Sequence, residues 1–177
     1  HGVMSLTESL DQSFLTLAER LQEQGYDTVG VNENPWVGER SNGLTQGFER
    51  FVNIECLFTR LLGKRLVRWQ PPSAGAGSSG GMAGAVEQWL AHRSAERPFF
   101  LFLNIMDAHS PYIVRGTNPY LPVGVTAREA RGVSLRGGDH LCKTPRWSRV
   151  MEILWALYLG GVSAADEKMG RVLEALS

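Results

Sequence analysis

The chain has 177 residues, and 18 lysines and arginines balance 18 aspartates and glutamates, so its formal net charge is zero. This balance argues against a domain that binds nucleic acid mainly through phosphate contacts. No stretch approaches the roughly 20 apolar residues of a membrane span, and the length suffices for one domain with a sizeable core. Cys56 and Cys142 are too few and too far apart for a disulfide framework or a Cys-x-x-Cys metal site, and we expect both as buried thiols.

The N-terminal part of the chain predicts a helix followed by a strand. Ser13 or Thr16 can cap the helix, and a glutamate stands three residues after Thr16, as in a capping box. Gly25 suits the position just after the last helical turn. Residues 26–31 then predict a short strand, and residues 32–36 the loop that follows it. The helix is expected to bury an apolar face composed of Leu15, Leu17, Ala18 and Leu21.

The middle of the chain is rich in turn-forming residues. Residues 38–47 are expected to form turns, most clearly at Asn42-Gly43, and residues 53–62 a short helix. Residues 71–84 are mostly proline, glycine, serine and alanine, and they predict a flexible connection. We expect this connection to lie within one domain, because the segments on both sides of it predict parts of one sheet.

A second helix and strand repeat the order of the first pair. Apolar residues between 85 and 90 indicate a helix that ends near 92–95. The apolar and aromatic run that starts at Pro98 predicts a strand buried on both faces. Two helix–strand units in this order are typical of an α/β fold, with a mostly parallel sheet flanked by helices.

The last third of the chain predicts a long loop and two helices. Residues 113–146 show little periodicity and are expected to form a functional or mobile loop. Residues 150–159 and 164–176 are amphipathic, and we expect two helices broken at Gly160-Gly161, with Ser163 capping the second. From position 128 to 149 the chain holds six basic and two acidic residues, which could steer an anionic substrate or form a solvated face.

Polar residues follow both predicted strands at the edge where α/β proteins bind their ligands. Asp107 and His109 come directly after the second strand, and Asn32 and Asn34 end the first. A histidine can donate to an anionic oxygen or move a proton near neutral pH. His109 is therefore the predicted functional residue, with a turn-capping role as the alternative. Asp107 and Asn34 are predicted either to contact a substrate or to shape their turns, for which both residue types are well suited.

Other familiar site patterns lack the sequence context that their chemistry needs. Asp139 and His140 are adjacent, but no third residue has a recognisable metal-ligand spacing. The glycine-rich segment 75–84 has the bare spacings of GxGxxG (residues 75–80) and GxSxG (residues 77–81), but it does not follow a strand and is a poor phosphate-binding loop. The sequence thus predicts no metal site within these residues.

Taken in order, several segments resemble the sulfatases of the alkaline-phosphatase superfamily. Residues 1–3 are similar to the His-Gly-Val that follows the active-site helix of that family. Residues 13–28 resemble its Thr-Leu-Ala-Glu segment with a later Gly-Tyr, and residues 34–48 its Asn-Pro-Trp loop and Gly-Leu-x-Gln-Gly-Phe turn. Residues 98–112 resemble its strand that ends in Asp-Pro-His-x-Pro-Tyr. Residues 158–176 are similar to a family helix, and the matching positions are Tyr158, Asp166 and Gly170.

The resemblance implies an alkaline-phosphatase-like sulfatase fold and hydrolysis of sulfate esters. In such enzymes a cysteine or serine of a C/S-x-P-x-R motif becomes formylglycine. Its hydrate attacks sulfur while a divalent cation, usually calcium, holds the sulfate oxygens. His109 matches the family histidine that contacts the sulfate or the leaving group. The implied partner is a sulfated small molecule or glycan, and neither nucleic acid nor a membrane span is expected.

The chain also departs from the family pattern. No C/S-x-P-x-R motif occurs in it, and the family's metal-binding aspartates have no counterpart. Residues 32–34 replace the Gly-Lys-Trp-His of many sulfatases, and Ala108 replaces a proline. We therefore expect residues 1–177 to be a partial sulfatase-like catalytic domain, an internal fragment inactive alone, with formylglycine and the cation ligands outside it. The alternatives left open are a phosphoester or phosphonate hydrolase of the same superfamily, and a degenerate binder of sulfated glycans.

Overall fold

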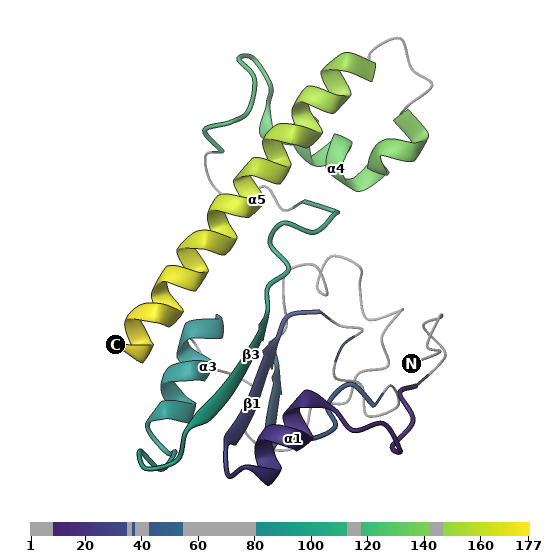
Figure 1. Ribbon diagram of the computed structural model, residues 1–177. Helices are drawn as coiled ribbons and strands as arrows, with labels where there is room; N and C mark the ends of the chain where they lie inside the picture. Colours follow the sequence, from purple (N-terminus) through teal and green to yellow (C-terminus); the bar gives the residue numbers. More distant parts are fainter. Residues whose placement is uncertain (1–8, 35–36, 38–42, 55–80, 113–117, 142–146) are drawn as a thin grey trace. The chain divides into compact units, whose positions relative to one another are not determined.

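The computed structural model describes residues 9–34, 37, 43–54, 81–112, 118–141 and 147–177, with side chains for all of these except 136–141. The chain divides into two compact units, whose elements are labelled in Figure 1. The first unit comprises residues 1–105 and 171–177, and the second comprises residues 106–170.

The described residues form helices and a three-stranded sheet. Their bounds in chain order are α1 Leu17–Glu23, β1 Asp27–Asn32, β2 Arg50–Asn53, α3 Gly81–Leu90, β3 Phe99–Asn104, α4 Ala127–Leu141 and α5 Trp147–Leu176. The strand order is β2-β1-β3, and both pairings are parallel. The expected α/β class with a parallel sheet flanked by helices is thus confirmed.

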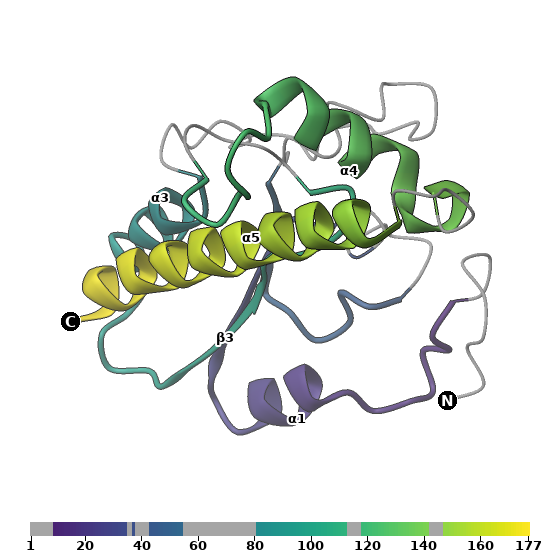
Figure 2. The same cartoon turned by 90° about the horizontal axis from the view of Figure 1, so that it is seen from above.

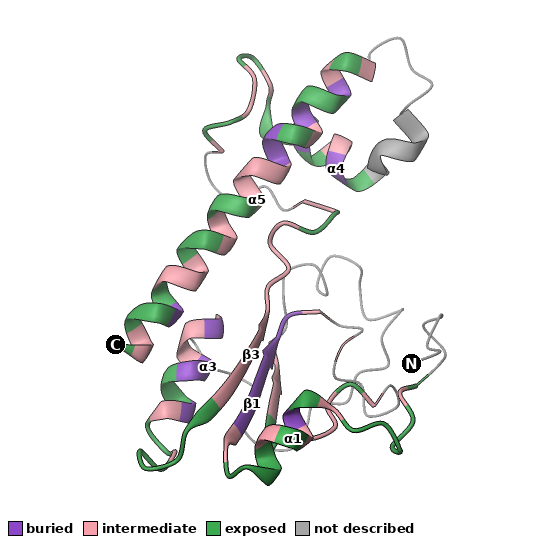
Figure 3. Ribbon diagram, in the orientation of Figure 1, coloured by how far each residue is buried: buried purple, intermediate pink, exposed green. Residues whose placement is uncertain are grey.

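The core of the first unit surrounds β1, the central strand, which Figure 3 shows as buried along nearly its whole length. Val29 and Val31 on one face pack with Met82, Val86 and Trp89 of α3. Figures 1 and 2 together show that α3 and α1 lie on opposite faces of the sheet. Alternate side chains of a strand point to opposite faces, so a central strand covered on both sides is buried at every position.

A cluster of phenylalanines covers the other face of the sheet. The Phe48 ring lies 5.3 Å from Phe51, 5.8 Å from Phe100 and 6.0 Å from Phe102, measured between ring centroids. Gly30 makes room for this cluster, because a Cβ at that position would lie 2.4 Å from the Phe51 ring. Glycine in a central strand often marks such a close approach.

α1 begins with the predicted capping box. The Thr16 hydroxyl accepts the N–H of Glu19 at 3.1 Å, and the Glu19 carboxylate accepts the N–H of Thr16 at 2.7 Å. Thr16 rather than Ser13 is therefore the N-cap. The predicted apolar face was wrong in part, because only Ala18 is buried while Leu15 and Leu17 are 49% and 63% exposed. With two turns of helix, α1 presents only a short strip to its neighbours.

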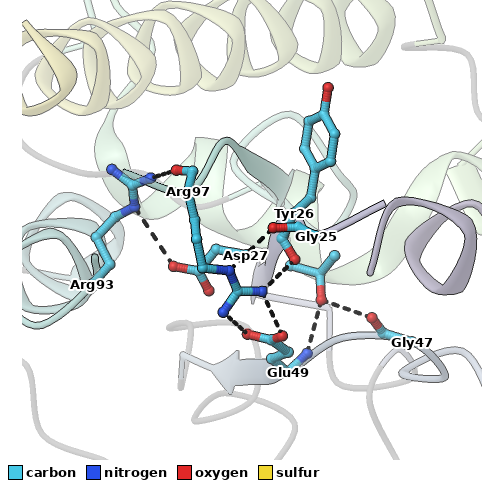
Figure 4. A network of polar contacts seen from close by, with 8 residues as sticks. Gly25, Tyr26, Asp27, Gly47, Glu49, Arg93 and Arg97 are labelled. Atoms are coloured by element: carbon cyan, nitrogen blue, oxygen red, sulfur yellow. Dashed lines mark hydrogen bonds and ion pairs between the residues drawn. The ribbon is translucent and has the colours of Figure 1, made fainter. Parts of the chain in front are cut away.

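Polar contacts tie the strands together at the amino end of the sheet (Figure 4). The Arg97 guanidinium donates to the main-chain oxygens of Gly25 and Tyr26 at 3.1 and 2.8 Å, and to the Glu49 carboxylate at 2.9 Å. The hydrogen bond from Arg97 holds the pKa of Glu49 below its ordinary value. This network fixes the chain just before β1, β2 and β3, at the amino-terminal edge of the sheet and opposite the carboxyl ends of the strands.

The outer strands differ from the sequence predictions. β3 was expected to be buried on both faces, but its side chains are only half-buried and Phe99 is exposed. Among the described strands it has one neighbour, β1, and thus lacks the cover of a central strand. β2 was not predicted, and residue 53, expected to start a helix, is its last residue. Residues 55–62 of that expected helix lie outside the described residues, as do Asn42, Cys56 and Cys142.

Two segments expected to lack regular structure contain helices. Residues 81–84 of the predicted connection form the first turn of α3, whereas residues 71–80 lie outside the described part. Residues 127–141 of the predicted loop form α4. The Thr126 hydroxyl accepts the N–H of Glu129 at 3.1 Å, which is a helix-capping contact. The three glycines of α4 hid its helical pattern in the sequence.

α5 is one continuous helix, so the predicted break at Gly160-Gly161 was wrong. The glycines serve packing within the second unit. A Cβ at 160 would lie 2.5 Å from the Asn118 side chain, and one at 161 would lie 2.4 Å from the main-chain oxygen of Asp107. Ser163 is interior to the helix, and its hydroxyl lies 2.8 Å from that of Tyr120.

α4 and α5 form the core of the second unit, and they lie side by side in Figure 2. Ala130 of α4 is buried with Ile153 and Leu157 of α5, and Tyr112 packs against them. In the part of the chain that the structure describes, no helix is both long and apolar enough to cross a membrane.

Candidate functional site

An asparagine ends each of the three strands, at the carboxyl edge of the sheet. The register pairs Asn32 of β1 with Asn53 of β2 on one side and with Asn104 of β3 on the other. Main-chain pairing extends past this row, because Ile54 N–H donates to Asn32 O at 2.7 Å and Glu33 N–H to Asn104 O at 3.0 Å. The polar row lies where parallel α/β sheets bind ligands.

The Asn32 side chain holds the loop that follows β1. It is 1% exposed, and its Nδ2 lies 2.7 Å from Asn34 O, 2.7 Å from Val37 O and 2.8 Å from Asn53 Oδ1. Its Oδ1 accepts the N–H of Asn34 at 3.0 Å. Asn34, the predicted substrate contact, is therefore fixed by its main chain while its side chain stays half-buried. Whether this amide meets a substrate stays a prediction.

The second unit carries the other two predicted residues in a turn that follows β3. His109 N–H donates to Met106 O at 3.0 Å and closes the turn. The His109 side chain is exposed, and its Nδ1 lies 2.5 Å from Ser110 O. A carbonyl only accepts, so Nδ1 carries the hydrogen in this contact and the neutral ring has its lone pair on Nε2. Such a ring can take a proton at Nε2 and then donate it to an oxygen anion.

Asp107, unlike the exposed His109, takes part in a buried ion pair. Its carboxylate accepts from Lys168 Nζ of α5, and the two side chains are 8% and 13% exposed. The pair is shielded from water, so its electrostatic interaction is screened less than that of a surface pair. Its main-chain oxygen meanwhile lies against Gly161. Asp107 thus fixes the turn to α5 by both its side chain and its main chain.

The segment that follows the turn is also held by the second unit's helices. Asn118 Nδ2 donates to Ala156 O of α5 at 3.1 Å, and Ser134 of α4 donates to Tyr112 O at 2.7 Å. The Tyr112 ring packs edge-to-face on Tyr158 at 6.3 Å between centroids. The turn is therefore held by Asp107, and the chain after it is anchored on both helices, which favours one defined position for His109 within this unit.

Sequence reasoning missed most of these supporting residues. Lys168 lies 61 positions from Asp107, and nothing local marks it as a partner. Asn53 was hidden because β2 is only four residues long. Asn104 sits in the segment that predicted β3, but its alignment with Asn32 follows only from the register of the sheet. The repeated occurrence of asparagine at predicted strand ends was the one available signal.

The donor set of the described residues does not fit the cation that the family resemblance implies. These residues contain no group of three histidine, cysteine or acidic side chains close enough to hold a metal ion. The Asp107 carboxylate, which follows β3 in the chain where a ligand would be expected, already pairs with an ammonium group. A cation of the kind this family uses would therefore need ligands from other residues.

The parallel α/β fold and the turn that carries Asp107 and His109 agree with the family match. The sulfatase family model matches residues 1–177, and the chain belongs to the sulfatase family. It is a domain of a sulfatase-type hydrolase, the class of enzyme that acts on sulfate esters. No curated protein matches the sequence.

Proposed function

We propose that this domain acts in the hydrolysis of a sulfate ester of a small molecule or glycan, with His109 contacting the sulfate or the leaving oxygen. The observation that carries the proposal is the exposed His109 ring, held by Ser110 O in a turn that follows β3. The family membership supplies the substrate class. In a neutral ring that donates through Nδ1, Nε2 carries the lone pair; once Nε2 has taken a proton it can donate to the leaving oxygen or to a sulfate oxygen.

Asn34 and Asp107 take different parts in this proposal. The Asn34 amide, half-buried after β1, is proposed to hydrogen-bond a polar group of the substrate. Asp107 was predicted to contact the substrate, and its buried pairing with Lys168 supports instead an effect through the turn that it shares with His109. An uncharged amide and an imidazole that donates a hydrogen bond are both suited to an anionic sulfate ester, because neither repels its charge.

The proposed reaction also needs a nucleophile and a cation, and we propose that residues outside this sequence hold both. The 177 residues contain no C/S-x-P-x-R motif, and the described ones contain no cation cluster. We propose that formylglycine and a divalent cation, of which calcium is the family's usual choice, would be held by other residues of a longer protein. When bound, they would supply the nucleophile and neutralise charge on the sulfate oxygens.

The first test is binding of inorganic sulfate to the 177-residue chain, followed by NMR of the histidine ring nitrogens. Sulfate is expected to shift the His109 signals in a saturable way, and His109→Gln should abolish saturable binding. His92 gives a matched control, because its ring is also exposed and its Nδ1 lies 2.7 Å from a main-chain oxygen, that of Gln88. His92→Gln should bind sulfate like the unmodified chain. Equal binding by both variants would refute the role of His109.

The second test uses the longest reading frame that contains this chain. The protein is assayed with 4-nitrophenyl sulfate and 4-nitrophenyl phosphate, and its nucleophile peptide is examined by mass spectrometry. Sulfate ester turnover with a formylglycine mass supports the proposal. A preference for the phosphate ester would favour a phosphoester hydrolase of the same superfamily. Sulfate binding without turnover of either ester would favour a non-catalytic binder of sulfated glycans.

A further inference from the structure

The turn that carries His109 rests on α5 through two contacts from a single residue. The side chain of Asp107 pairs with Lys168, and its main-chain oxygen lies where a Cβ of Gly161 would be 2.4 Å away. Positions 161 and 168 are seven residues apart, about two turns of helix, and therefore lie on the same face of α5. Asp107 thus contacts one face of α5 at two positions about two helical turns apart.

These contacts reach His109 through very little intervening structure. Asp107 and His109 are separated by Ala108 alone, and the hydrogen bond from His109 N–H to Met106 O closes the turn around them. The Ser110 oxygen that receives His109 Nδ1 belongs to the next residue. A change in the position of Asp107 will therefore move both the imidazole and the carbonyl that fixes its hydrogen on Nδ1.

The ion pair is suited to hold this position. Lys168 and Asp107 are 13% and 8% exposed, so the carboxylate has exchanged much of its hydration for the ammonium group. When one partner of such a pair is removed, the remaining buried charge is strongly destabilised and its surroundings rearrange. A surface pair on the same helix, between Arg149 and Glu152 at 3.8 Å with 38% and 60% exposure, has no such consequence.

From these contacts we infer that Lys168 is a positioning residue for His109, acting through the Asp107 carboxylate. Lys168 holds Asp107 against α5, Asp107 sets the turn, and the turn sets the ring and its hydrogen on Nδ1. The inference rests on the proposed function for its biological meaning. Its structural content, that Lys168 controls the state of the His109 ring, can be measured without any turnover.

The experiment compares Lys168→Met, Lys168→Arg and Arg149→Met in the 177-residue chain by NMR of the His109 ring nitrogens. In Lys168→Met the Nδ1 and Nε2 signals should move toward the averaged values of a ring that exchanges between tautomers. Lys168→Arg, which keeps the charge, should restore most of the original signals. Arg149→Met should leave them unchanged, and the ring signals of His92 should stay constant in all three variants.

A loss of folding in Lys168→Met would not remove the test. Asp107→Asn keeps an oxygen that accepts from Lys168 and is a milder change, and it should shift the His109 ring signals in the same direction. Unchanged His109 signals in whichever of these variants folds would overturn the inference. So would a change of the same size in Arg149→Met, because the effect would then come from α5 in general.

Sulfate binding separates this inference from the proposed function. In the folded Lys168→Met variant, sulfate affinity should fall on the order of tenfold or more, as expected when a contact group is displaced by about 1 Å. If the His109 ring signals move in Lys168→Met but neither this variant nor the unmodified chain binds sulfate, the positioning role stands and the proposed function fails. If both bind sulfate equally and the ring signals stay constant, the proposed function stands and the positioning role fails.

Discussion

The main-chain oxygen of Asp107 lies against the backbone of Gly161, at a distance that leaves no room for a side chain. An ideal Cβ at position 161 would be 2.4 Å from this oxygen and 3.0 Å from the Cα of Ala108. Both neighbours are main-chain atoms, which cannot move aside by a rotamer change. The turn that carries His109 and the helix beneath it are therefore in direct backbone contact.

Alanine at position 161 is expected to destabilise the second unit, because the turn must shift away from α5. The cost should be about 1–3 kcal/mol, as for other overpacked sites, and urea denaturation will measure it. Gly170 is the matched control, since it lies in the same helix and a Cβ there meets nothing within 4 Å. Gly170→Ala should stabilise by about 0.5–1 kcal/mol through helix propensity. Equal effects of the two changes would contradict the packing role.

Asn32→Ala is expected to destabilise the first unit by about 2–3 kcal/mol, because several polar groups around a buried site lose their partner. The groups that lose Asn32 are the oxygens of Asn34 and Val37 and the Asn53 side chain. Asn53→Ala is the control, since it removes one of these contacts and leaves the loop contacts intact. Its cost in urea denaturation should be clearly smaller. If Asn53→Ala costs as much as Asn32→Ala, the contact between the Asn32 and Asn53 side chains would account for all of the stabilisation.

Glu49→Gln is expected to lower stability in a pH-dependent way. The hydrogen bond from Arg97 lowers the pKa of Glu49, so the contribution of its carboxylate is present above the unfolded value of 4.5 and is lost as pH falls through the lowered value. The difference from the unmodified chain should be about 0.5 kcal/mol at pH 7, since the pair is partly exposed. It should vanish in strong acid. Thermal unfolding of both proteins across pH measures it, and a difference that does not shrink in acid would contradict this role of the carboxylate.

Thr16→Ala is expected to cost about 1 kcal/mol, because Thr16 is the N-cap of α1 and its hydroxyl accepts the N–H of Glu19. Ser13→Ala is the control. Ser13 was an equally acceptable cap by sequence, but in the structure it precedes the helix by four residues. Chemical denaturation of the two variants decides between the caps. A larger loss for Ser13→Ala would mean that the helix starts earlier in solution.

Local signals predicted the first half of the fold well, because α1, β1, α3 and β3 carry their own caps and apolar runs. They failed where tertiary contacts outweigh propensity. Gly160 and Gly161 together disfavour a helix by about 2 kcal/mol relative to alanine, and their sequence predicts a break. In the structure they admit Asn118 and the main chain of Asp107 against α5, and that packing favours the helix.

The candidate site was predicted only as far as single residues. Strand ends followed by polar residues pointed to His109, Asp107 and Asn34. The partners that fix them come from elsewhere in the chain, such as Lys168 for Asp107. A pairing across 61 residues follows from how α5 meets the turn, which no local pattern encodes.

Gly30 shows how a residue without a side chain can be among the least replaceable. The space beside it is occupied by the Phe51 ring, so mutational tolerance at position 30 is set by the size of a neighbour on another strand. The two positions should therefore vary together among relatives. A larger residue at 30 would be accepted only where 51 has become smaller, and such coupled changes would report the β1–β2 pairing from sequences alone.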